Sequence, residues 1–197
     1  MSKEDHFIRG NQIGFAAQDC KRFITTCKEL ALTLTNLGEV HFALGHCEEA
    51  YDYTQQALSL AQEQGDRWVE ATALHDLGTL SSTFEHENAF EAALEYYGQA
   101  YHIFREIDAR EDAITVLKNI GYLHLFQKKE PKRYEVILAC FLQAGEIANQ
   151  VQETAPDAIP RGVMLELELA LSKQRLQALR EEVEGRREQI IEQALQA

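Results

Sequence analysis

A two-part pattern that occurs three times constrains the fold of this chain more than any other feature of its sequence. The first part reads Leu34-x-x-Leu37-Gly38-x-x-His41, Leu74-x-x-Leu77-Gly78-x-x-Ser81 and Leu117-x-x-Ile120-Gly121-x-x-His124. The second part reads Ala50-x-x-x-Thr54-x-Gln56-Ala57, Ala93-x-x-x-Tyr97-x-Gln99-Ala100 and Ile137-x-x-x-Phe141-x-Gln143-Ala144. The interval from Ala57 to Leu77 is 20 residues, and so is that from Ala100 to Ile120. Such regular self-similarity predicts a repeat architecture.

Each repeat is expected to form a pair of antiparallel helices. Residues spaced like Leu34, Gly38 and His41 fall on one stripe of a helix. A glycine in the middle of a helix costs about 1 kcal/mol relative to alanine, so its recurrence indicates that a second helix crosses closely at that point. Small residues such as Ala50 and Ala57 would serve the same contact from the second helix. The apolar stripe left over on each hairpin is buried only by the next hairpin, which predicts a solenoid.

These motifs resemble the tetratricopeptide repeat, whose family pattern is Trp-x2-Leu-Gly-x2-Tyr followed by Ala-x3-Phe-x2-Ala. The resemblance covers about residues 31–150. It implies an all-α, right-handed superhelical solenoid of antiparallel helix pairs, with about three repeat units and flanking capping helices. The chain departs from the family in having leucine in place of tryptophan and periods of 40 to 44 residues instead of about 34. Long repeats of this kind are similar to those of kinesin light chains and of bacterial peptide-sensing regulators.

The sequence predicts three segments: a loose N-terminus and degenerate capping helix (1–24), three helical hairpins (25–152), and a C-terminal capping helix with a charged helical tail (153–197). The N-terminal capping helix is expected because apolar residues follow helical spacing from Ile13 to Phe23. The C-terminal capping helix is expected to start near Asp157 or Pro160, since proline is tolerated in the first turn of a helix.

The charged tail from Lys173 onward carries apolar residues seven positions apart: Leu169, Leu176, Val183, Ile190 and Ala197. The alternate core positions of this heptad are mostly polar, which weakens a coiled-coil interpretation. We therefore interpret the segment 165–197 as a solvated helix packed along the last hairpin. A homodimeric coiled coil through this helix and partial disorder after Gly185 stay open as alternatives.

The charge of the chain argues against one large class of partner. Nineteen Lys and Arg stand against 32 Asp and Glu, a net charge of −13. The excess is concentrated between Ala31 and Arg110, where 14 acids and three bases give −11. Nucleic-acid binding depends on clustered bases, so we expect no nucleic-acid partner. The one basic cluster, around Pro131, is interpreted as a helix-to-helix loop, with contact to an acidic partner or a lipid headgroup as the alternative.

Further patterns bear on the compartment. No apolar run reaches the roughly 18 residues that a membrane span needs, and the start of the chain shows no signal-peptide pattern. The four scattered cysteines, Cys20, Cys27, Cys47 and Cys140, favour reduced thiols over a disulfide framework. We therefore expect a cytoplasmic protein without a membrane span.

The sequence also lacks the usual signatures of catalysis. It has no Cys-x-x-Cys or His-Glu-x-x-His spacing, no Gly-rich phosphate loop and no nucleophile elbow. His41 and His124 occupy the tyrosine position of the family pattern, so the resemblance assigns them to packing and not to a metal. We expect no enzymatic activity, no metal and no cofactor.

The concave side of the predicted solenoid is the expected binding surface. In each first helix, the residues about half a turn away from the packing stripe would line it. The candidate partner-binding residues are Thr35, Asn36, Glu39, Phe42, His75, Asp76, Thr79, Lys118, Asn119, Tyr122 and Phe126. Of these, the aromatic residues could hold apolar anchors of a partner.

A polar residue precedes each Leu-Gly or Ile-Gly: Asn36, Asp76 or Asn119. A side-chain amide both donates and accepts, so a row of amides can pair with the backbone of an extended peptide. In kinesin light chains, asparagines at this position form such a ladder, and the resemblance transfers that role to Asn36 and Asn119. Asp76 departs from it, because a carboxylate only accepts. The alternative is that the two asparagines bond to the neighbouring repeat.

The favoured hypothesis is a non-catalytic adaptor that binds an extended or helical segment of a partner protein or peptide in the concave groove. The acidic central portion would prefer a partner with basic residues. Two other hypotheses stay open: a regulatory sensor whose superhelix changes shape on binding a peptide or small effector, and a structural subunit held in a larger assembly through the 165–197 helix.

Overall fold

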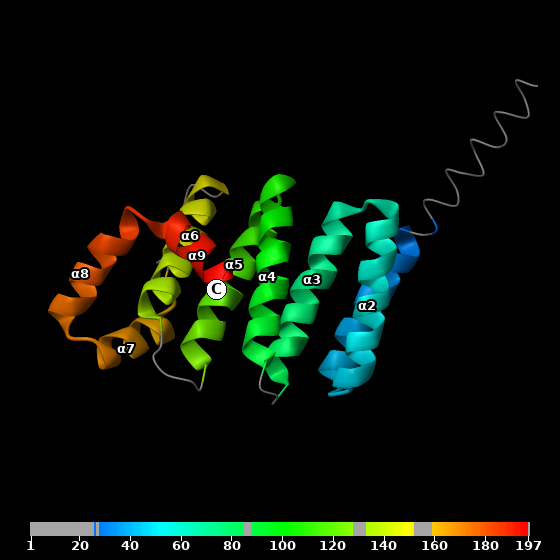
Figure 1. Ribbon diagram of the computed structural model, residues 1–197, viewed down its shortest axis with the longest axis horizontal. Coiled ribbons are helices and arrows are strands. Elements are labelled where there is room, and N and C mark those ends of the chain that lie inside the picture. The colour runs from blue at the N-terminus through cyan, green and yellow to red at the C-terminus, as the bar shows by residue number, and fades with distance from the viewer. Residues whose placement is uncertain (1–25, 27, 85–87, 128–132, 152–158, 197) are drawn as a thin grey trace, which may run out of the picture. The chain divides into compact units, whose positions relative to one another are not determined.

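The computed structural model describes residues 26, 28–84, 88–127, 133–151 and 159–196 (Figure 1). Within these residues every regular element is a helix, which confirms the predicted all-α class. The helices are 28–43, α2 (Cys47–Gln64), α3 (Arg67–Thr83), α4 (Ala89–Glu106), α5 (Arg110–Phe126), α6 (Tyr134–Val151), α7 (Arg161–Ala170), α8 (Lys173–Glu184) and α9 (Arg187–Leu195). The chain divides into two compact units, 1–73 (unit 1) and 74–197 (unit 2), and α3 runs from one into the other.

In unit 1 the helix 28–43 and α2 form the first helix pair. Gly38 lies against Thr54 of α2, and a Cβ at residue 38 would overlap the threonine hydroxyl. The start of α3 completes the unit, because Val69 packs against Ala31 and Ala61 in a fully buried apolar cluster. The small residues of the pattern therefore lie where the helices approach each other.

Unit 2 contains the same contact twice. Gly78 of α3 lies against the ring of Tyr97 in α4, and a Cβ there would come within 2.6 Å of a ring carbon. Gly121 of α5 lies against Phe141 of α6, with a corresponding distance of 2.7 Å. Consecutive helices pack on one another, α4 on α5 and α5 on α6 (Figure 1). The prediction that a second helix crosses closely at each mid-helix glycine is confirmed at all three positions.

The corner between α4 and α5 has the same hydrogen bonds as the corner between α2 and α3. The matched bonds are Gly65 N–H to Gln62 and Asp66 N–H to Ala61 in the first corner, and Asp108 N–H to Arg105 and Ala109 N–H to Phe104 in the second. Both corners need a left-handed residue, with φ of +66° at Gly65 and +55° at Asp108. Glycine adopts this conformation freely, whereas another residue pays about 1 kcal/mol. Asp108 is therefore a strained residue at a glycine position.

The segment after residue 159 agrees with the sequence analysis at its start and differs further on. α7 begins at Arg161, directly after Pro160, as expected. The continuous helix predicted for the charged tail is wrong. The chain breaks before α8, where the Ser172 hydroxyl accepts a hydrogen bond from the Arg175 N–H at 3.3 Å, and it breaks again at Gly185.

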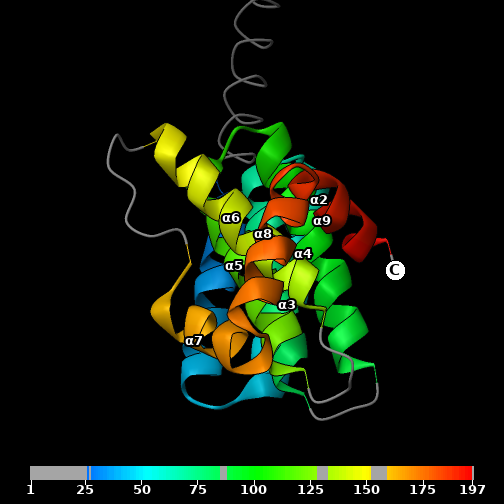
Figure 2. The same ribbon diagram turned by 90° about the vertical axis from the view of Figure 1, so that its left-hand side faces the viewer.

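The two short helices α8 and α9 pack within unit 2 (Figure 2). Both contact α6, and α9 also contacts α4. The heptad residues Leu176, Val183 and Ile190 are buried there, and Arg187 of α9 forms an ion pair with Glu146 of α6. These three apolar side chains are thus used inside the unit, whereas Leu169 of the same heptad is 75% exposed; a homodimer through 165–197 stays a prediction.

Some sequence predictions concern residues outside those that the structure describes, and others stay untested within them. The N-terminal capping helix predicted within 1–24 and most of the basic cluster around Pro131 lie outside the described residues. The predicted segment limits 1–24, 25–152 and 153–197 and the right-handed superhelix stay predictions.

His124 is part of the core of unit 2, as the resemblance implied. It is 1% exposed, and the edge of its ring meets Phe90 with centroids 5.1 Å apart. Neither ring nitrogen has a hydrogen-bond partner among the described residues. Burial lowers the pKa of His124 to about 4, and the positive charge of Arg133 acts in the same direction. The imidazole is therefore neutral and packs as an apolar ring.

Replacing Gly121 by alanine should destabilise the protein. The new Cβ would collide with the Phe141 ring, and the cost of overpacking exceeds the gain in helix propensity, for a net loss of about 1–2 kcal/mol. Urea denaturation measures this loss. The matched control is Gly162→Ala in α7, where a Cβ meets nothing within 4 Å, so stability should be unchanged or slightly higher. Equal effects of the two changes would contradict the close-packing role of Gly121.

His124 should make the protein less stable in mild acid. Its pKa is about 4 when folded against 6.5 for the free side chain, so the unfolded state binds the proton first. The contribution of neutral His124 to the free energy of unfolding is fully present above about pH 7. It is lost as the pH drops from 6.5 towards 4. His124 alone should remove about 2 kcal/mol between pH 7.5 and pH 5.

Urea unfolding at these two pH values, compared with His124→Leu, isolates the contribution. The variant should lose this part of the pH dependence. The same slope in wild type and His124→Leu would show that His124 is not the titrating group.

Candidate functional site

Seven of the predicted partner-binding residues lie in unit 2, on two first helices of the repeat. His75, Asp76 and Thr79 belong to α3, and Lys118, Asn119, Tyr122 and Phe126 belong to α5. The side chains of Lys118 and Phe126 are exposed, and the other five are partly buried. These seven residues are called the α3–α5 surface below.

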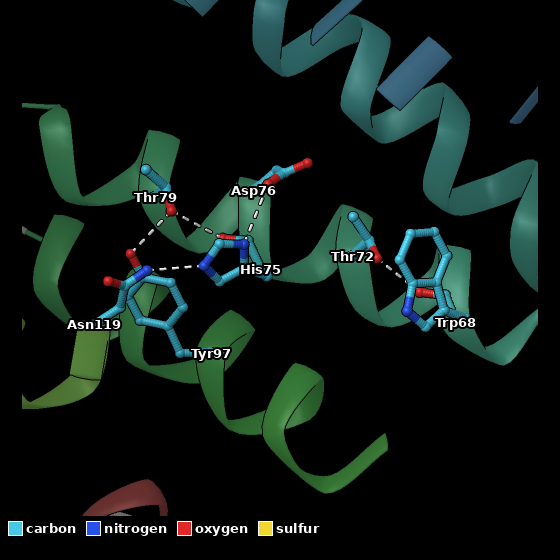
Figure 3. Close-up of polar contacts among 7 residues, drawn as sticks. All are labelled: Trp68, Thr72, His75, Asp76, Thr79, Tyr97 and Asn119. Carbon is cyan, nitrogen blue, oxygen red and sulfur yellow. Dashed lines mark hydrogen bonds and ion pairs between the residues drawn. The ribbon is translucent and has the colours of Figure 1, made fainter. Parts of the chain in front are cut away.

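A hydrogen bond joins α3 to α5 (Figure 3). The amide nitrogen of Asn119 lies 2.8 Å from His75 Nε2, and His75 Nδ1 lies 3.2 Å from an oxygen of Asp76. An amide nitrogen only donates, so Nε2 accepts and the hydrogen of His75 is on Nδ1, where it donates to the carboxylate. The tautomer of His75 is thereby set by its two neighbours.

Asn119 therefore makes the contact that the alternative interpretation described, a bond to the neighbouring repeat. Only the amide nitrogen of Asn119 takes part in this bond, and the amide oxygen does not. The second carboxylate oxygen of Asp76, Oδ2, is buried and has no partner among the described residues. An unpaired buried acceptor of this kind is costly, so the cluster retains the capacity to accept a hydrogen bond.

Thr79 and Tyr97 lie next to His75, Asp76 and Asn119, and the five residues together form a polar cluster (Figure 3). The Thr79 hydroxyl lies 3.1 Å from the Tyr97 hydroxyl and 3.2 Å from the His75 carbonyl oxygen. Burial raises the pKa of Tyr97, so the phenol is neutral. The sequence analysis named Tyr97 only as part of the repeat pattern and not as a candidate binding residue. Its hydroxyl reaches the α3–α5 surface because its ring lies over Gly78.

The end of α5 presents an aromatic pair. The rings of Tyr122 and Phe126 stack with centroids 6.0 Å apart and planes 9° apart. Tyr122 is held from the other side by the edge of the Phe141 ring at 5.1 Å. Phe126 is 71% exposed. A large apolar side chain is thus held on a rigid support and faces solvent.

The four predicted residues of unit 1 are less uniform. Asn36 and Glu39 are exposed and Phe42 is partly buried. Thr35 is only 2% exposed, and its hydroxyl donates to the Ala31 carbonyl oxygen at 3.1 Å. Thr35 therefore lies in the packing of its own helix, unlike the position that the sequence analysis assigned to it.

The described residues contain no group of three or more His, Cys, Asp or Glu side chains arranged to hold a metal ion. Cys140 of α6 is fully buried, and burial raises the pKa of its thiol to about 12, so it is unreactive as a nucleophile.

In the part of the chain that the structure describes, none of the helices has the length and apolar character that crossing a bilayer requires.

The family model of the tetratricopeptide repeat matches residues 29–92. This range covers nearly all of the helix 28–43, α2, α3 and the start of α4. It therefore includes Gly38 and Gly78, two of the three glycines that make close contacts with a paired helix. The match supports membership of the tetratricopeptide-repeat family, whose repeats generally mediate protein–protein interaction and are typically non-catalytic. No curated protein matches the chain. The likeness to kinesin light chains stays a prediction.

The bond between Asn119 and His75 can be measured by a double-mutant cycle. Asn119→Ala, His75→Ala and the double variant should show a coupling of about 1 kcal/mol in urea denaturation, because each single change leaves a polar partner unpaired. The control pairs His75→Ala with Thr115→Ala, an exposed residue one turn earlier on α5, and should show no coupling. Zero coupling between Asn119 and His75 would mean that the amide is not used structurally.

Proposed function

We propose that this chain is a non-catalytic adaptor that binds a segment of a partner protein, extended or helical, on the α3–α5 surface. The family match supports a protein partner. The observation that carries the proposal is the exposed ring of Phe126, stacked on Tyr122 and about two turns along α5 from Asn119, whose amide bonds to His75. Interface hot spots combine a rigid aromatic anchor with nearby polar groups that fix orientation.

The polar atoms of the surface suit a peptide backbone. The carbonyl oxygen of Asn119 has no partner among the described residues, since the bond to His75 uses the amide nitrogen. It can accept a hydrogen bond from a peptide N–H, independent of the partner's sequence. Backbone contacts would give affinity, and Phe126 would give selectivity.

The equivalent helix of unit 1 offers a similar set of side chains. Asn36, Glu39 and Phe42 are a separate candidate set within unit 1, because their side chains are exposed or partly buried. Thr35 is left out, because it is buried and its hydroxyl is used within its own helix.

Charge favours a partner with basic residues. The segment from Ala31 to Arg110 carries 14 acids and three bases, so a basic segment would be attracted and an acidic one repelled. This attraction is screened by salt. Affinity that does not change across a salt titration would remove the electrostatic part of the proposal and leave the apolar part.

Phe126→Asp should abolish partner binding without affecting the fold, because the side chain is mostly exposed and the change places a charge in the proposed apolar contact. Affinity capture from cell extract, quantified by mass spectrometry, compares this variant with wild type. The matched control is Leu169→Asp, which charges an equally exposed apolar residue of α7 (75% exposed).

Partners lost with Phe126→Asp and kept with Leu169→Asp support the proposal, provided that circular dichroism and thermal unfolding match wild type. Partners lost equally with both variants would indicate nonspecific capture through exposed apolar residues. Partners kept with Phe126→Asp would refute binding through the α3–α5 surface.

A further inference from the structure

A cavity of about 600 Å³ lies within unit 2, where the end of α4, the start of α5, the second half of α6 and the turn between α8 and α9 meet. None of the residues of the α3–α5 surface lines it. The volume is that of a pocket for a small organic molecule. We infer that this cavity is a binding site for a small organic anion, a molecule in which a carboxylate or phosphate group is joined to an apolar body.

Arginines are gathered at this cavity. Four of the eleven arginines of the chain line it: Arg105, Arg110, Arg186 and Arg187. Four carboxylates also line it: Asp108, Glu146, Glu184 and Glu188. The lining is therefore neutral in a chain of net charge −13. Guanidinium groups bind carboxylate and phosphate through two parallel N–H bonds, so arginine is the residue type that selects an anion here.

The carboxylates hold the guanidinium groups in place. Asp108 accepts from Arg110 Nε at 2.8 Å and from Nη2 at 3.4 Å. These bonds use one edge of the guanidinium, and the remaining N–H groups have no partner among the described residues. Arg187 is fixed in the same way by Glu146 of α6. An arginine that is oriented before the ligand arrives loses less entropy on binding.

The strained backbone of Asp108 is consistent with this role. The equivalent corner of the preceding repeat has Gly65, and both corners make the same hydrogen bonds. Glycine would remove the strain but would also remove the carboxylate that orients Arg110. Strained residues that a fold retains tend to lie at functional sites, and Asp108 lines the cavity.

Two helices begin at the cavity. α5 starts at Arg110 after Ala109, and α9 starts at Arg187 after Arg186; neither helix has a side-chain cap. The first N–H groups of a helix and its dipole favour negative charge. Both helix ends therefore act in the same direction as the arginines.

Gln143 of α6 is an independent indication of a ligand. It lines the cavity and is only 9% exposed, yet its side-chain amide has no hydrogen-bond partner among the described residues. The equivalent glutamines of the other repeats are exposed and bonded within their own helices: Gln56 to the Asp52 carbonyl oxygen and Gln99 to Glu95. The amide atoms themselves are accessible to solvent, so an anion in the cavity could accept a hydrogen bond from the amide N–H.

The remaining part of the lining is the reason for assigning the ligand an apolar body. Phe104 and Ala113 are each 2% exposed, and Ile147 lies beside them. These side chains are the apolar part of the lining, next to which a ligand's apolar body could lie.

Four probes that share one ring test the inference on the full chain. Phenyl phosphate and phenylacetate carry the two anionic groups, benzyl alcohol is neutral, and benzylamine is cationic. Titration followed by NMR should show saturable binding of at least one anion at or below about 10 mM, with benzyl alcohol and benzylamine weaker. The comparison of the two anions tells whether a phosphate or a carboxylate is preferred.

Matched variants locate the site. Arg110→Gln should weaken the anion about tenfold, whereas Arg180→Gln, an exposed arginine of α8 away from the cavity, should not. Gln143→Leu should weaken it, whereas Gln99→Leu should not. Asp108→Gly should weaken it without lowering the melting temperature, because glycine relieves the left-handed backbone. If Asp108 had only a structural role, Asp108→Gly would not weaken anion binding while leaving the melting temperature unchanged.

Three results would overturn the inference. The first is the absence of saturable binding of either anion by the wild-type protein. The second is equal weakening by Arg110→Gln and Arg180→Gln, which would show a general charge effect. The third is tighter binding of benzylamine than of both anions, which would show that the carboxylates define the site. Phe126→Asp should bind the probes like wild type, so this test is separate from that of partner binding.

Discussion

The close contact between a mid-helix glycine and a larger side chain of the paired helix is the constraint on which the rest of the structure depends. Gly38, Gly78 and Gly121 lie against Thr54, Tyr97 and Phe141. Each contact sets both the distance and the rotation of one helix relative to the other. In unit 2 the two contacts fix α3 on α4 and α5 on α6. Together with the packing of α4 on α5, they place Asn119 within reach of His75, 44 residues earlier in the chain. They also place the Tyr97 hydroxyl beside Thr79 and the Phe141 ring beneath Tyr122. The polar cluster and the aromatic support of Phe126 are thus consequences of helix packing.

The helix pairs were predictable because the glycine contact is repeated, and each copy can be recognised against the others. On α3 and α5 the candidate residues are exposed or partly buried, as the spacing predicted, whereas on the helix 28–43 Thr35 is buried and Leu37 is 38% exposed. Three features were not predictable. The heptad of Leu176, Val183 and Ile190 has the same spacing whether it faces a second chain or α6, and only the breaks at Ser172 and Gly185 decide between them. The partner of Asn119 depends on the separation of two helices. The cavity is formed by the ends of several helices, so no local pattern marks it.

Unit 2 thus presents two surfaces with different physical character. The α3–α5 surface carries an exposed aromatic ring on the same helix as Asn119, whose carbonyl oxygen is unused, which suits a polypeptide. The cavity is concave, lined by oriented arginines and two helix N-termini, which suits a small anion. α5 contributes to both, through residues near its end in the first case and near its start in the second. The two proposals therefore rest on separate residues of one helix and can be tested separately.

The burial of α6 has a consequence for motion. Ten consecutive residues of this helix, 136–145, are buried, because α5 covers one side and α8 and α9 cover another. A helix at a protein surface keeps one face in water, and its amides exchange hydrogen through small local openings. No such opening is available to α6 unless the helices around it first separate. The slowest amide exchange in unit 2 therefore belongs to the middle of α6, at the level of the cooperative unfolding of the whole unit.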